Sequence, residues 1–271
     1  MEKIRYTTDY PDTQLVKMLV RHVVTVNNLR AATADPAKDR IGGRQPRVNV
    51  APSGPDQARR FARLAPGRLR ELLDGEFAVV GLSRSLSRRT KVTAETVRDE
   101  WGLQLPIERT LDLAELHKGY RLLGGHQERL RAGVVNDEYR ARRAREDWDF
   151  RYGDPTWNRL GMHYLNRAQT EREVGMHVLR WINRKPPVPE DVATSGVPLV
   201  DIGFGHGMSG TRGIAMALHG GQEGSDEVGI TVAEAEQAYK LPNASGFVLS
   251  RDESGLWVER GRIILPDVAA H

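Results

Sequence analysis

The segment from Val197 to Gly213, VPLVDIGFGHGMSGTRG, constrains the fold more than any other part of the chain. An apolar run typical of a buried strand leads into five glycines within eleven residues, and the helical stretch GIAMALH follows. In many proteins a strand that enters a glycine-rich turn and then a helix brings backbone N–H groups against a phosphate or a nucleotide. The segment therefore predicts a strand–turn–helix unit with an anionic ligand.

The composition sets bounds on the class of protein. A chain of 271 residues can form one large domain or two small ones. It has no cysteine, which excludes disulfides, thiol catalysis and cysteine-based metal sites. No apolar run approaches the roughly 18 residues that span a bilayer, and the N-terminus lacks the apolar core of a secretory signal. We therefore expect no membrane partner and a cytoplasmic location, or a virion if the protein is a phage structural component.

Residues 1–185 are expected to form a helical and mixed α+β domain. The spacing of Leu15, Leu19 and Val23 predicts a helix over residues 12–32. Further patterns predict a strand over residues 76–82 and helices over 66–74, 93–101 and 157–183.

A proline-rich segment and a small C-terminal unit are expected to follow. Residues 186–198 lack periodicity and are predicted to be a linker. Residues 199–271 predict a small α/β unit that ends in a β-hairpin, with Gly255 closing its turn. The fold class expected for the whole chain is α+β.

The core of the glycine-rich segment, Asp201-Ile-Gly203-Phe-Gly205-His-Gly207, resembles the first motif of class I S-adenosylmethionine-dependent methyltransferases. In that family the glycines let the loop pass close to the cofactor. The resemblance implies that Asp201, Gly203, Gly205 and Gly207 bind S-adenosylmethionine. The same segment also resembles the phosphoribosyltransferase loop, and a glycine-rich connection without a ligand is a third alternative.

A second segment, GYRLLGGHQERLRAG at residues 119–133, resembles the ParB/sulfiredoxin-like domains, whose G-x-H/R-R loop contacts nucleotide phosphate or DNA. The resemblance implies a contact set of Gly125, His126, Gln127, Arg129 and Arg131. An ordinary hairpin end is the alternative.

Arginine clusters favour an anionic partner. The formal net charge is +4, and a basic turn at residues 83–91 contains Arg88 and Arg89. Guanidinium groups suit phosphate contacts, and salt-sensitive nucleic-acid binding requires clusters of this kind. We therefore add Arg88 and Arg89 to the expected contact surface. The alternatives are a genome-wide preference for arginine and a solvated face of mixed charge.

The histidines of the predicted helix 157–183 do not indicate a metal site. On one helix His163 and His177 would lie about 21 Å apart along the axis, too far to share an ion. We expect no metal and interpret both side chains as core or interface residues.

The sequence taken as a whole favours a nucleic-acid- or nucleotide-binding protein, ParB-like and phage- or plasmid-borne. One alternative is a transferase that uses S-adenosylmethionine or a phosphoribosyl donor. Another is a structural or virion assembly protein without catalysis. A homo-oligomer or larger assembly is compatible with each of these.

Overall fold

The computed structural model describes residues 4–23, 25–26, 49–50, 53–114, 148–149, 170–220 and 227–266. Its strands are β1 (Tyr6–Thr7), β2 (Leu15–Arg21), β3 (Thr25–Val26), β4 (Asn49–Val50), β5 (Ala78–Arg84), β6 (Ile107–Arg109), β7 (Val188–Pro189), β8 (Leu199–Gly205), β9 (Gly246–Arg251) and β10 (Trp257–Ile263). Its helices are α1 (Gly54–Leu72), α2 (Arg88–Glu100), α4 (Glu171–Asn183), α5 (Glu190–Ala193), α6 (Gly207–His219) and α7 (Val232–Tyr239), with a short 3-10 turn at Asp12–Gln14.

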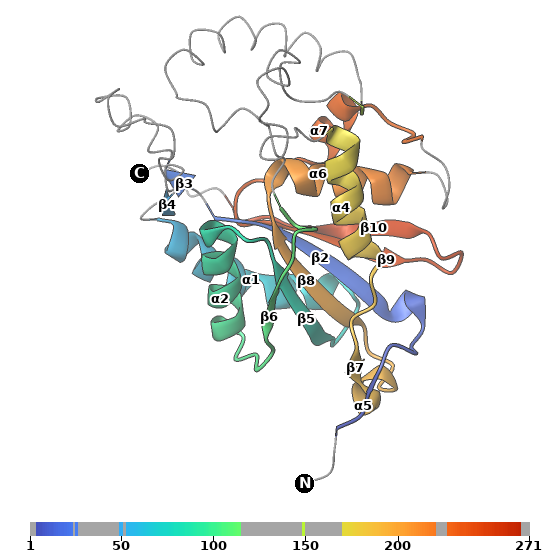
Figure 1. Cartoon of the computed structure of the whole chain (residues 1–271). Coiled ribbons are helices and arrows are strands. Elements are labelled where there is room, and N and C mark those ends of the chain that lie inside the picture. Colours follow the sequence, from blue (N-terminus) through green and yellow to red (C-terminus); the bar gives the residue numbers. More distant parts are fainter. Residues whose placement is uncertain are drawn as a thin grey trace, which may run out of the picture.

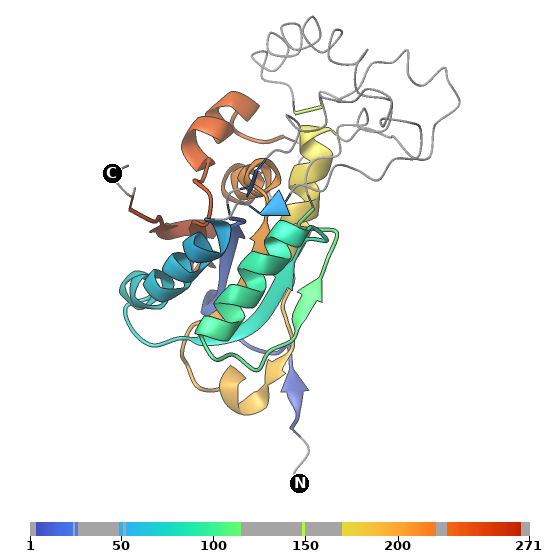
Figure 2. The same ribbon diagram turned by 90° about the vertical axis from the view of Figure 1, so that its left-hand side faces the viewer.

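A six-stranded sheet forms the centre of the molecule, in the order β10-β9-β2-β8-β5-β6 (Figure 1). Strands β2, β8, β5 and β6 are parallel, and β9 and β10 add an antiparallel hairpin at one edge. Helices α1 and α2 cover one face of the sheet, and α4 and α6 cover the other (Figures 1 and 2). The expected α+β class is confirmed, with a mostly parallel central sheet.

The predicted helix over residues 12–32 is wrong, because residues 15–21 form the central strand β2. Alternate side chains of β2 pack on opposite faces: Val16 and Met18 join the core under α1 and α2, and Leu15 and Leu19 join the core under α4 and α6. A parallel strand covered on both faces has an almost continuous apolar sequence. A spacing of four residues keeps one face in a strand as well as in a helix, so it could not distinguish the two.

The sheet includes strands from both sides of the proline-rich segment 186–198. β2 and β5 precede that segment, and β8, β9 and β10 follow it. The segment itself contains β7, which pairs with β1, and the short helix α5. The polypeptide on either side of residues 186–198 therefore contributes to one sheet.

Other predicted elements are present with shifted bounds. Helix α1 begins at Gly54, well before the predicted residue 66, and α2 begins at Arg88 because the Ser87 side chain accepts the N–H of Thr90 and caps the helix. The C-terminal hairpin is confirmed, and Gly255 in its turn has φ +83°, a conformation that favours glycine.

Among the described helices, none combines the length and the apolar character that crossing a membrane requires.

Glycine at position 203 allows α4 to pack closely on the sheet. A Cβ atom added to Gly203 would lie 2.7 Å from two carbons of the Trp181 indole, which is completely buried. The glycine is therefore needed for packing, since φ at this position is not in the left-handed region.

We expect Gly203→Val to lower the free energy of unfolding by about 1–3 kcal/mol, because the buried Trp181 indole cannot move away from the added side chain. Urea unfolding measures the change. Gly67→Ala is the matched control, because a Cβ on Gly67 would meet no atom within 4 Å. Equal stability of the two variants would contradict this account of Gly203.

Candidate active site

Two histidines lie side by side where the parallel strands β2 and β8 end. The two strands pair in register up to Arg21 opposite Gly205, and the N–H of His22 then donates to the Gly205 carbonyl at 3.2 Å. His22 and His206, the next residue on each strand, have ring centroids 5.1 Å apart in an edge-to-face arrangement. Both are almost fully buried. In open α/β sheets, ligands bind at the carboxyl ends of the strands, which is where these rings lie.

A neighbouring carbonyl group determines which nitrogen of the neutral His22 ring carries the proton. The Nδ1 atom lies 2.6 Å from the carbonyl oxygen of Val23. A carbonyl oxygen only accepts hydrogen bonds, so Nδ1 carries the proton and donates a hydrogen bond to the Val23 carbonyl. In the neutral ring the lone pair is then on Nε2, the nitrogen that can act as a nucleophile or a base.

His206 immediately precedes helix α6 and is its N-cap residue. Its Nε2 atom lies 2.9 Å from the hydroxyl oxygen of Ser85, which follows β5. The first N–H groups of α6 have no acceptor within the helix, and the helix dipole adds partial positive charge at this end. The surroundings of the two rings therefore favour a negatively charged group.

Arg21 brings a full positive charge to the same end of α6. Its guanidinium donates to the carbonyl oxygen of Leu241, and its Nε lies only 2.7 Å from where a Cβ on Gly207 would be. The main chain of Arg21 and His22 is also held: the N–H of Ala244 lies 3.1 Å from both of their carbonyl oxygens. Ala244 has φ +49°, a conformation that costs energy outside glycine and often marks functional sites.

Helix α2 supplies a second arginine beside the site. The hydroxyl of Thr93 accepts the N–H of Val23 at 3.2 Å and donates to the carbonyl of Arg89 at 2.9 Å. Arg89 therefore lies in the helical turn next to the residues that follow His22, and it is half-buried. Arg88, its neighbour, is exposed. Of the two arginines expected to contact an anion, Arg89 is the one whose carbonyl is linked through Thr93 to Val23, the residue after His22.

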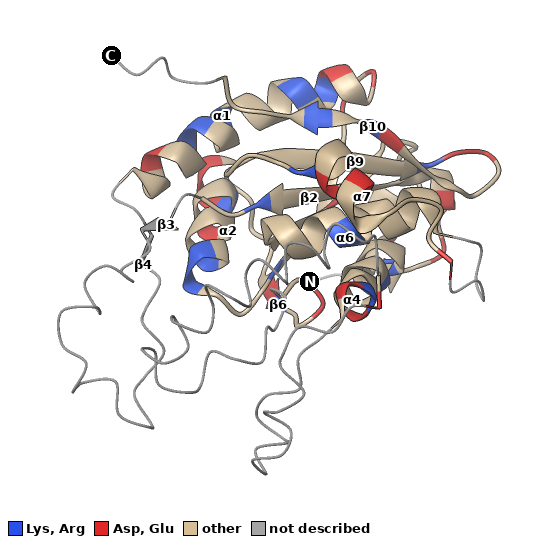
Figure 3. Ribbon diagram, turned by 90° about the horizontal axis from the view of Figure 1, so that it is seen from above, with Lys and Arg blue, Asp and Glu red and all other residues tan. Residues whose placement is uncertain are grey.

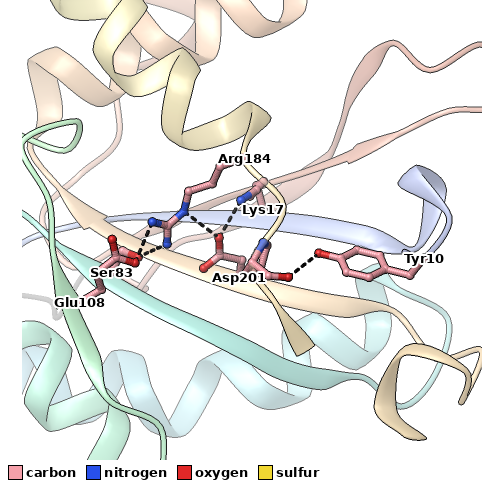
Figure 4. Close-up of polar contacts among 7 residues, drawn as sticks. Tyr10, Lys17, Ser83, Glu108, Arg184 and Asp201 are labelled. Carbon is pink, nitrogen blue, oxygen red and sulfur yellow. Dashed lines mark hydrogen bonds and ion pairs between the residues drawn. The ribbon is translucent and has the colours of Figure 1, made fainter. Parts of the chain in front are cut away.

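Asp201, the acid of the glycine-rich motif, lies in the interior and not at the end of the strand. Its Oδ2 atom is 2.6 Å from the ammonium nitrogen of Lys17, and both side chains are completely buried (Figure 4). The Arg184 guanidinium lies 3.6 Å from the same oxygen. Burial lowers the pKa of Lys17, and the neighbouring Asp201 carboxylate opposes that shift. Asp201 thus neutralises a buried cation.

The remaining predicted site residues are the glycines of the glycine-rich motif and the residues of the ParB-like segment. Gly203 and Gly205 belong to strand β8, and Gly207 begins α6 beside Arg21. The ParB-like contact set lies outside the described residues: Gly125, His126, Gln127, Arg129 and Arg131.

The arginines of α1 and α2 mostly face acidic neighbours. Arg59 pairs with Asp56, Arg68 with Glu71, and Lys91 with Glu95. Lys and Arg positions are interspersed with Asp and Glu positions along the described ribbon (Figure 3). This pattern matches the alternative of a solvated face of mixed charge.

Within the parts of the chain that the structure describes, no group of three or more His, Asp or Glu side chains is placed to hold a metal ion. His177 lies near Asp112, at 3.6 Å, on the surface of α4. His163 is outside the described residues.

Comparison with solved structures shows the fold. A mycobacterial hydrolase is 18% identical with a TM-score of 0.58, over 94% of this chain and 93% of that chain. The mycobacterial glucosyl-3-phosphoglycerate phosphatase is 20% identical with a TM-score of 0.54, over 90% and 96%. The alpha-ribazole phosphatase of Shigella flexneri is 14% identical with a TM-score of 0.50, over 93% and 100%. The sequence matches no protein-family model and no curated protein.

These neighbours correct the function expected from the sequence. The similarity covers nine-tenths or more of the chain, and the similar structures are hydrolases and phosphatases. The resemblances to ParB/sulfiredoxin-like domains at residues 119–133 and to methyltransferases at residues 197–213 were therefore misleading. The expectations of a DNA-binding, methyltransferase or structural phage protein are wrong for the same reason.

The sequence contained a signal for the two histidines. Both apolar strand sequences, LVKMLVRH and LVDIGFGH, end in histidine. This signal was missed because residues 12–32 were predicted to be a helix, which placed His22 within a helix and not at the end of a strand. Around His206 the glycines were interpreted as a ligand-binding loop, and the histidine itself was not predicted as a site residue.

We expect Asp201→Ala to destabilise the protein by about 3–5 kcal/mol, because it leaves the ammonium of Lys17 buried without its counterion. Thermal or urea unfolding measures this. The double variant Lys17→Met/Asp201→Val should recover most of the loss, since it removes both charges and keeps similar volumes. A stable Asp201→Ala variant would show that the pair contributes little.

Proposed function

We propose that this protein is a phosphatase in which His22 accepts the phosphoryl group of a phosphate monoester. The observation that carries the proposal is the contact between the His22 and His206 rings at the ends of β2 and β8. The hydrogen bond from Nδ1 of His22 to the Val23 carbonyl favours the tautomer in which Nε2 has the lone pair, and we assign Nε2 as the atom that attacks phosphorus.

The surroundings supply charge stabilisation. Arg21 contributes a guanidinium, and the N-terminus of α6 contributes N–H groups and its dipole. Arg89 is the second guanidinium that we assign to the phosphoryl oxygens. Positive groups aimed at the equatorial oxygens are what phosphoryl transfer requires.

The reaction has two steps. Nε2 of His22 forms a bond to phosphorus while the bond from phosphorus to the leaving oxygen breaks. Water then attacks phosphorus, the phosphorus–nitrogen bond breaks, and inorganic phosphate leaves. Over both steps one water is consumed: a proton ends on the leaving oxygen and the hydroxyl ends on phosphorus.

Similar structures support this proposal. Two of the proteins that share the fold are phosphatases of small phosphorylated compounds, glucosyl-3-phosphoglycerate and alpha-ribazole phosphate. The former has been solved with VO3 and with inorganic phosphate. A histidine-type phosphatase is the function that these neighbours favour.

The test is hydrolysis of p-nitrophenyl phosphate and a panel of phosphate monoesters by the purified chain. His22→Asn should lower kcat/KM by at least about a thousandfold, because it removes the nucleophile. His177→Asn, which changes a partly exposed histidine on α4, is the control and should leave activity unchanged. Absence of hydrolysis of every monoester, or full activity of His22→Asn, would overturn the proposal.

We also expect Gly207→Ala to weaken inhibition by vanadate about tenfold, because its Cβ would displace the Arg21 guanidinium. The melting temperature should change little, since alanine is a better helix former than glycine and this offsets the loss of the Arg21 hydrogen bond to the Leu241 carbonyl. Unchanged vanadate inhibition would show that Arg21 does not bind the oxyanion in this position.

A further inference from the structure

The hydroxyl of Ser85 is held in contact with His206 at the ends of β5 and β8. Ser85 follows β5 and is almost completely buried. Its N–H donates to the carbonyl of Phe204 on β8 at 3.0 Å, which fixes its main chain beside the strand that directly precedes His206. Its Oγ then lies 2.9 Å from Nε2 of His206.

A second hydroxyl lies behind Ser85. Thr90 Oγ1 is 2.9 Å from Ser85 Oγ, and it lies 2.9 Å from the carbonyl of Ser87 and 3.2 Å from that of Ser85. The Thr90 hydroxyl can donate its single proton to either carbonyl, since carbonyl oxygens only accept. When it does so, the Thr90 oxygen can accept a hydrogen bond from Ser85.

This arrangement lets Ser85 pair with His206 in either protonation state. When Nε2 of His206 has its lone pair, the Ser85 hydroxyl donates to it. When Nε2 carries a proton, that N–H donates to Ser85, and the Ser85 hydroxyl turns to donate to Thr90. A hydrogen bond to the ring is kept in both cases, so the ring can gain or lose a proton without losing its orientation.

We propose that Ser85 is a positioning residue for His206, which holds the ring against His22 through the proton movements of phosphoryl transfer. The effect of Ser85 on catalysis in this inference rests on the proposed phosphatase function. The contact itself, from Ser85 to Nε2 of His206, does not depend on that function and can be tested in the resting protein.

The matched control is Ser83. It lies two residues before Ser85, within β5, and is equally buried, but its hydroxyl accepts from Arg184 and not from a histidine (Figure 4). Ser83→Ala therefore removes a buried hydroxyl of the same strand without touching His206.

The first measurement is the NMR spectrum of the histidine ring nitrogens in ¹⁵N-labelled wild-type protein, Ser85→Ala and Ser83→Ala. We expect the His206 signals, identified with His206→Asn, to shift in tautomer population or titration midpoint in Ser85→Ala and to stay unchanged in Ser83→Ala. An unchanged His206 ring in Ser85→Ala would overturn the proposal, whatever the activity of the protein. If Ser85→Ala does not fold, Ser85→Cys is used, since a thiol is a weaker donor of similar size.

The second measurement is a double-mutant cycle on kcat/KM with p-nitrophenyl phosphate. Ser85→Ala should lower kcat/KM about ten- to a hundredfold in the wild-type background, mainly through kcat, the effect of losing one strong hydrogen bond. In the His206→Asn background the same change should have almost no effect, because the partner is gone. Equal losses in both backgrounds would overturn the proposal. A wild-type protein without phosphatase activity would refute the proposed function, and the NMR result would then decide the Ser85 contact alone.

Discussion

The parallel pairing of β2 with β8 determines where the two candidate catalytic histidines lie. The register runs without a shift from Leu15 opposite Leu199 to Arg21 opposite Gly205. Because both strands point the same way and end together, the two following histidines meet. A slip of one residue would reverse the face of every side chain on β2 and separate the rings. The site is thus a direct consequence of strand register.

The buried ion pair specifies that register. Lys17 lies directly opposite Asp201 in the ladder, and their charged atoms are 2.6 Å apart with no exposure to solvent. In any other register two buried charges would lose their partners, and each would then cost several kcal/mol. Gly81 on β5 makes room for the carboxylate, since a Cβ there would collide with it. Groups in the core of the sheet therefore help to hold the histidines at its end.

Sequence reasoning predicted the parts of this fold that local chemistry dictates. The C-terminal hairpin, the strand at β5 and the glycine-rich strand–helix unit follow from turn residues, branched side chains and glycine spacing. β2 could not be assigned in this way, because its burial on both faces depends on helices distant in sequence. His22 and His206 come together only because β2 pairs with β8. These strands are far apart in sequence, with 184 residues between the paired Lys17 and Asp201, so no local pattern reveals the pairing. Asp201 was expected to bind a cofactor, whereas in the structure its carboxylate pairs with Lys17 of the same distant strand.

The most direct test of this account is to trap the phosphoryl group on the enzyme. Wild-type protein is mixed with a phosphate monoester that it hydrolyses, quenched in alkali to preserve phosphohistidine, digested and analysed by tandem mass spectrometry. We predict a phosphoryl group on the His22 ring, absent when His22 is replaced by asparagine. A phosphoryl group on His206 or on another residue, or turnover without any phosphorylated histidine, would contradict it.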